Sequence, residues 1–219
     1  AGYLQKPKAN NQKPKTISVM SIMQYLAIAA AAICLCSLFA FFLKIVRLGK
    51  PNDLSEKSGD TKQGVIYSNT TAMMPQNKES AYLHWPAYAS GILFHIGTLV
   101  VLLVFVLSFF PFFNRWISGP DKIHCIIPCL LAVTAVCGYT LLLRRAFSAD
   151  LKPLSNPDDY ISNALVSTFQ LMTMLYLLMP ASKSVVTVYY VVAILLFLYM
   201  PLGKLRHVVY YFAARYQLK

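Results

Sequence analysis

Gly91-Ile92-Leu93-Phe94-His95-Ile96-Gly97 places one histidine among apolar residues, inside a longer apolar run over 87–110. A run of about 20 apolar residues is long enough to cross the hydrocarbon core of a membrane as a helix. A histidine inside such a helix is costly unless it has a partner, so it marks a candidate functional site. His207, at the end of the last apolar run, is one candidate partner.

The rest of the chain has the same membrane character. Of its 219 residues, 57% are hydrophobic and 13% are charged, and the mean hydropathy is +0.53. A soluble domain of this size is usually about a quarter charged. We therefore predict an all-α integral membrane bundle of five helices within 17–219, after a polar N-terminal tail over 1–16. The expected spans are 17–46, 87–110, 123–143, 160–179 and 185–200, the last continuing as one helix to Tyr216 at the membrane surface.

The net charge of +12 does not indicate a nucleic-acid partner, because the Lys and Arg residues flank apolar runs instead of forming one basic domain. Thirteen of the 20 lie after the first and third spans and at the C-terminus. This distribution predicts a cytoplasmic C-terminus, an outside N-terminus and a location in the cell membrane. The long polar segment over 47–86 is a candidate docking segment for a soluble partner, and a loop without fixed structure is the alternative.

Five cysteines lie in or beside the expected spans and do not form a disulfide framework. The chain has no Cys-x-x-Cys-His motif for covalent haem, and no cysteine set for an iron–sulfur cluster of its own. Any such cluster must belong to another subunit.

The two histidines are expected at similar depths in the membrane. His95 lies about eight residues, or roughly 12 Å, inside the cytoplasmic end of its span, and His207 lies near the cytoplasmic exit of the last span. We predict that both bind one haem iron; alternatively, His95 bonds to a neighbouring helix. Gly91, one turn before His95, would let a flat macrocycle approach the backbone. The candidate counter-ions for the haem propionates are Arg144, Arg145, Lys204 and Arg206, although Arg144 and Arg145 are also typical topology determinants.

Two of these stretches resemble the gamma subunit of respiratory nitrate reductases. Leu93-Phe94-His95-Ile96-Gly97 is similar to its Leu-Phe-His-Ile-Gly stretch, and Pro201-Leu202-Gly203-Lys204-Leu205-Arg206-His207 is similar to its C-terminal end. Residues 141–147 and 215–218 also resemble it, and the similarity covers roughly 87–218. The membrane subunits of heterodisulfide reductase and of sulfite-reduction-associated complexes are similar members. The resemblance implies five helices, an outside N-terminus, b-type haem between helices two and five, and quinol chemistry. His95 and His207 match the ligands of the haem nearest the cytoplasmic partner.

The chain departs from the family at the second haem. In two-haem members a further ligand pair falls at the positions that hold Phe105 and Tyr189 here. A phenylalanine cannot bind iron, so we expect one haem b, with the outer one absent.

The position of a quinone is less well marked. Lys122 approximately matches a lysine that the family associates with its quinol site, and His124 at the outer end of span three is a candidate contact with a quinone headgroup. Asn163, Ser167 and Gln170 share one face of span four. They line a quinone site in one interpretation and make polar contacts between helices in the other.

The sequence thus predicts a cytochrome b subunit of a quinone-linked oxidoreductase complex. It would transfer electrons between a quinone and an iron–sulfur subunit at the cytoplasmic face. We expect the quinone to be menaquinone, and further catalytic subunits to complete the complex. A haem-free membrane anchor is the alternative. A small transporter is a third hypothesis, but the sequence has no clear internal repeat and no acidic residue within an expected span.

Overall fold

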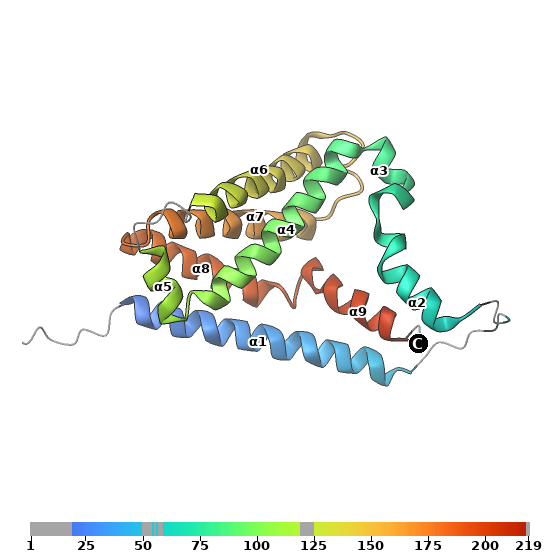
Figure 1. The fold of residues 1–219 in the computed structure, drawn as a ribbon, viewed down its shortest axis with the longest axis horizontal. Coiled ribbons are helices and arrows are strands. Elements are labelled where there is room, and N and C mark those ends of the chain that lie inside the picture. The colour runs from blue at the N-terminus through green and yellow to red at the C-terminus, as the bar shows by residue number, and fades with distance from the viewer. Residues whose placement is uncertain (1–18, 50–53, 55, 57–58, 119–124, 218–219) are drawn as a thin grey trace, which may run out of the picture.

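The computed structural model describes residues 19–49, 54, 56, 59–118 and 125–217 (Figure 1). Every regular element in these ranges is a helix, and the long ones are α1 (Val19–Arg47), α4 (Trp85–Leu107), α6 (Ile126–Phe147), α7 (Pro157–Leu178) and α8 (Lys183–Tyr199). Four of these are long and apolar enough to cross a membrane, and α8 makes a fifth crossing when it is joined to α9 (His207–Gln217). The prediction of an all-α membrane helical bundle is confirmed.

The long helices run along the longest axis of the molecule and alternate in direction (Figure 1). α6 packs against both α4 and α7, α7 packs against α8, and α8 packs against α1. One end of the bundle carries the start of α1 and the short helix α5 (Pro111–Ile117). The other end carries α9, so the first described residues and the end of α9 lie at opposite ends of the bundle.

Small residues bring the helices together. Ala27, Ala30 and Cys34, three and four residues apart on α1, are buried in the helix that packs on α8. A side-chain carbon at Gly97 would collide with Thr134 of α6. Such positions allow helix backbones to approach closely where no water drives the association.

The segment expected to dock a partner is largely helical. It contains α2 (Thr61–Asn69), two 3₁₀ turns and α3 (Glu79–Leu83), and Figure 1 shows it crossing the end of the bundle transversely to the long helices. The hydroxyl of Tyr211 in α9 donates to Asn69 over 3.5 Å and links the two segments. The alternative of a loop without fixed structure is therefore wrong for 61–83, whereas docking stays a prediction.

The expectation of one continuous last helix is wrong. α8 ends at Tyr199, a 3₁₀ turn η4 follows over Lys204–Arg206, and α9 begins at His207 after a bend of 66°. Pro201 lacks the N–H that would continue the helix. A side-chain carbon at Gly203 would meet the ring of Tyr199 and a carboxylate oxygen of Asp158. His207 thus begins a new helix and does not end the span.

α7 also begins earlier than expected. The side-chain oxygen of Asn156 caps it by accepting a hydrogen bond from the backbone N–H of Asp159. In return, the carboxylate of Asp159 accepts one from the backbone N–H of Asn156. This reciprocal pair is a capping box. Two acidic residues, Asp158 and Asp159, therefore lie in the first turn of α7, a candidate span, directly before the span expected over 160–179.

Candidate functional site

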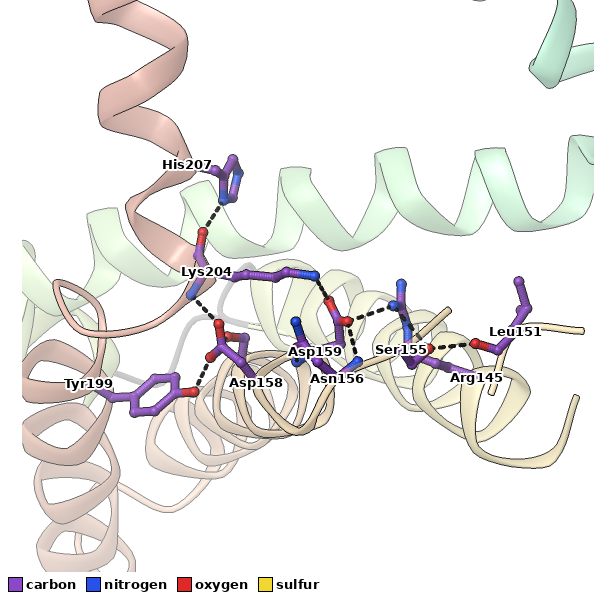
Figure 2. A network of polar contacts seen from close by, with 10 residues as sticks. Arg145, Leu151, Ser155, Asn156, Asp158, Asp159, Tyr199, Lys204 and His207 are labelled. Atoms are coloured by element: carbon purple, nitrogen blue, oxygen red, sulfur yellow. Dashed lines mark hydrogen bonds and ion pairs between the residues drawn. The ribbon is translucent and has the colours of Figure 1, made fainter. Parts of the chain in front are cut away.

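The bend between α8 and η4 is held by one carboxylate from α7. Asp158 accepts hydrogen bonds from the Tyr199 hydroxyl, from the Ser162 hydroxyl at 3.1 Å and from the backbone N–H of Lys204 at 2.5 Å (Figure 2). Tyr199 precedes the bend and Lys204 follows it, so a single side chain fixes both of its sides. The position of His207, three residues after Lys204, therefore depends on α7.

The neighbouring carboxylate, Asp159, forms ion pairs with two cations. Asp159 lies 2.6 Å from Nζ of Lys204 and 3.3 Å from Nη1 of Arg145, and its side chain is only 9% exposed (Figure 2). The structure thus brings together two of the four predicted counter-ions, from η4 and α6. Both already face a carboxylate, which sequence analysis did not expect. The Asn-Pro-Asp-Asp run over 156–159 was the available signal, because it begins a helix with acidic residues.

The two histidines share one hydrogen-bonding arrangement. Nδ1 of His95 lies 2.7 Å from the carbonyl oxygen of Gly91, and Nδ1 of His207 lies 2.9 Å from that of Lys204. A carbonyl oxygen only accepts, so in the neutral ring Nδ1 carries the proton and Nε2 keeps its lone pair. This tautomer, with a backbone carbonyl fixing the ring, is the one in which histidine binds metals through Nε2. Both side chains are exposed.

Open space adjoins both rings. A pocket of about 250 Å³ has His207 in its wall together with the cations Lys204 and Arg206. On α4, a side-chain carbon at Gly91 would meet no atom within 4 Å. α4 and α9 are not among the closely packed helix pairs of the described chain. The residues that line the pocket at His207 come from α7, the bend, η4 and α9, and none of them comes from α4.

The remaining predicted counter-ions lie apart from Asp159. Arg206 is 5.8 Å from the centre of the Phe41 ring on α1 and also lines the pocket at His207. Arg144 lines a different pocket, together with His84. Adjacent helical residues point about 100° apart, which explains why Arg145 reaches Asp159 and Arg144 does not.

Aromatic rings fill the region of the absent second ligand pair. Phe105 and Tyr189 both contact Phe169, with ring centres 6.4 and 5.6 Å apart, respectively. Tyr176 also stacks on Tyr189, with ring centres 4.6 Å apart. All four side chains are buried. Phe169 thus packs against both Phe105 and Tyr189.

The predicted quinone residues fall into two groups. Lys122 and His124 lie outside the described residues. Gln170 is fully buried, and its amide nitrogen donates to the carbonyl of Phe94 at 3.0 Å and to Thr98 at 3.1 Å, both on α4. Ser167 donates to Asn163 of its own helix at 2.9 Å. Gln170 thus makes a contact between helices, whereas Ser167 and Asn163 bond within α7, and a quinone site at this face stays a prediction.

In the described part of the chain, no group of three or more His, Cys, Asp or Glu side chains is arranged to bind a metal ion. A pair of histidines on separate helices is the remaining metal-binding arrangement that the sequence suggested. No protein-family model, characterised protein or solved structure matches the chain. Its function is therefore argued from its own residues.

Proposed function

We propose that the protein is the cytochrome b subunit of a quinone-linked membrane oxidoreductase complex, with one haem b bound by His95 and His207. The observation that supports this proposal is the contact that the two rings share, because Nδ1 of each lies within hydrogen-bond distance of a backbone carbonyl oxygen. Two such imidazoles at one iron leave no open coordination position, so the haem supplies one-electron transfer without binding oxygen.

The surrounding residues have separate roles in this proposal. Asp158 positions His207 by fixing the bend before it. Gly91 keeps the face of α4 beside His95 free of side-chain atoms. Lys204 and Arg206 place positive charge in the wall of the pocket beside His207, where carboxylate groups of a haem would need counter-ions.

A single haem is favoured by the aromatic packing around Phe169. A second macrocycle between Phe105 and Tyr189 would have to displace the Phe169 ring, which contacts both of them. Displacing a buried aromatic side chain costs about 3–5 kcal/mol when it leaves a cavity. Phe105 cannot bind iron, and Tyr189 would have no second ligand opposite it, so iron binding does not compensate for that loss.

The proposal places the haem near the cytoplasmic face, where electrons pass between menaquinone and an iron–sulfur partner. The surplus of Lys and Arg at the end carrying α9 supports this orientation. The helical segment over 61–83 crosses that same end and exposes large apolar side chains, among them Ile66 and Tyr82. It is the proposed docking surface for the partner.

A discontinuous span is also a mark of transporters, the third hypothesis. In transporters of that kind, the backbone groups freed at the break are left to coordinate the substrate. Here the N–H of Lys204 is bonded to Asp158, and Asp159 is paired with Lys204 and Arg145. The internal pairing of this bend favours a structural role over substrate binding.

The test is a reduced-minus-oxidised absorption spectrum of the purified protein, with haem counted per chain. We expect b-type bands and one haem, and loss of haem in both His95→Ala and His207→Ala. His84→Ala is the matched control, because His84 is an exposed histidine just before α4 and is expected to leave the haem in place. Absence of b-type bands would support the haem-free anchor, and normal six-coordinate haem in both alanine variants would exclude the pairing.

A further inference from the structure

A second pocket, of about 240 Å³, opens between the start of α4 and the end of α6. Two of its lining residues, His84 and Arg144, are exposed nitrogen-bearing side chains. Leu83, Pro86 and Leu141 make its apolar wall. The pocket therefore combines hydrogen-bond donors with a hydrophobic lining.

The hydroxyl groups in the pocket are already engaged. Ser90 donates to the carbonyl of Pro86 at 2.7 Å, and Thr140 donates to the carbonyl of Val136 at 2.8 Å. Donation to a ligand is therefore left to Arg144, whose guanidinium has five N–H groups, and to the imidazole of His84. Such a donor set suits a ligand that is rich in acceptor oxygens.

The electrostatics of the pocket favour an anion. No Asp or Glu lines it, whereas the neighbouring Arg145 is paired with Asp159. The first turn of α4, a helix of 23 residues, contributes the positive end of its dipole. Arginine binds phosphate oxygens in a planar, often bidentate arrangement.

The pocket also lies at the level where spans begin and end. It is formed by the first turns of α4 and the last turns of α6, both of which are candidate membrane spans. Trp85 and Tyr88 stack at that level with ring centres 6.3 Å apart, as is typical of a membrane–water boundary. Further into the membrane, exposed apolar side chains such as Ile92 and Val136 offer a surface for acyl chains.

We propose that this pocket binds the phosphate headgroup of an anionic phospholipid, with Arg144 and His84 as its donors. The lipid would occupy the groove between α4 and α6, with its phosphodiester at the pocket and its chains along the two helices. This site is separate from the pocket at His207, because the two pockets share no lining residue.

The test uses native mass spectrometry of the detergent-purified full chain with added phosphatidylglycerol or phosphatidylcholine. We expect one tightly bound phosphatidylglycerol and weaker binding of phosphatidylcholine. Loss of a charge-assisted hydrogen bond should weaken the first phosphatidylglycerol about tenfold in Arg144→Gln. His84→Gln should weaken it less, and Lys152→Gln, an exposed cation in the connection to α7, should not change it.

Equal weakening by Lys152→Gln would overturn the proposal, because the binding would then follow surface charge alone. Binding of phosphatidylcholine as tight as that of phosphatidylglycerol would overturn the proposal as well. Glycerol phosphate, added at the same concentration as a competitor, tests whether the pocket binds a free phosphate instead of a lipid. If it displaces phosphatidylglycerol, the assignment to a lipid is contradicted. If Arg144→Gln does not fold, Ser90→Leu is the second variant, because it fills the pocket without changing its charge. It should weaken phosphatidylglycerol about as much as is expected of Arg144→Gln. Unchanged binding of phosphatidylglycerol by Ser90→Leu would refute the site.

Discussion

Asp158 in the first turn of α7 accepts a hydrogen bond from the backbone N–H of Lys204, 46 residues later in the chain, at 2.5 Å. The same carboxylate accepts from the hydroxyl of Tyr199, on the other side of the bend. A helix break leaves N–H groups without intrahelical partners. This one is capped by another helix, so the geometry of the bend is a tertiary property and not a local one.

Asp158→Ala should therefore destabilise the bend. The variant loses an ionised acceptor shared by three donors, and such hydrogen bonds contribute about 1.5–3 kcal/mol each. We expect a lower apparent melting temperature and, if the proposed haem is present, a lower haem content, because His207 follows the bend. Asp150→Ala is the control, since Asp150 is exposed in the connection before α7. An unchanged melting temperature in Asp158→Ala would mean that the carboxylate does not fix the bend.

Arg145 and Lys204 should show coupled effects through Asp159. Either cation alone still neutralises this carboxylate, which is 9% exposed, so Arg145→Gln and Lys204→Gln should each have a small effect. Removal of both leaves the carboxylate without a counter-ion, which should destabilise the fold clearly more than either single change. The double variant should thus lose more stability than the sum of the two single variants, measured by thermal unfolding in detergent. Strict additivity would show that the two cations act separately.

Tyr189→Phe should leave haem content unchanged and should not lower stability. In the part of the chain that the structure describes, the buried hydroxyl of Tyr189 has no hydrogen-bond partner, so its removal eliminates a desolvated polar group. Tyr190→Phe is the matched comparison, because the Tyr190 hydroxyl accepts from Gln24 at 3.1 Å and lies 3.4 Å from that of Ser108. Its loss should cost about 1 kcal/mol. Loss of haem from Tyr189→Phe would contradict the single pair of iron ligands.

The helical bundle was predictable because the hydrocarbon thickness of a membrane dictates long apolar runs, and α1, α4 and α6 follow that rule directly. The bend before His207 was not predicted, although Pro201 and Gly203 are local signals for it. The expected span ends at Met200, directly before both residues, and hydropathy does not distinguish a broken helix from one that continues out of the membrane. Asp158 and Asp159 directly precede the span expected over 160–179, so the earlier start of α7 was not predicted.

Arg145 and Lys204, two of the four predicted counter-ions, lie together, whereas their role toward a haem stays a prediction. The common partner, Asp159, comes from a third element, and sequence spacing within one helix carries no information about such contacts. The same limit applies to Arg144 and to the buried Gln170. Their surroundings depend on which face of a helix meets a neighbour, and a helix that is apolar on all sides does not reveal that face.

Gly91→Ala and Gly138→Ala should separate haem binding from folding. A side-chain carbon at Gly138 would collide with Ser167 and with the ring of Phe94, so Gly138→Ala should cost about 1–3 kcal/mol through overpacking. A side-chain carbon at Gly91 would meet no atom within 4 Å, so the alanine variant should fold normally and gain slightly from its helix propensity. If the proposed macrocycle approaches α4 beside His95, Gly91→Ala should nevertheless lower haem content in the purified protein. Stable folding with full haem in Gly91→Ala would show that the macrocycle does not approach that face. Gly64→Ala in α2 is the control for the glycine-to-alanine change itself.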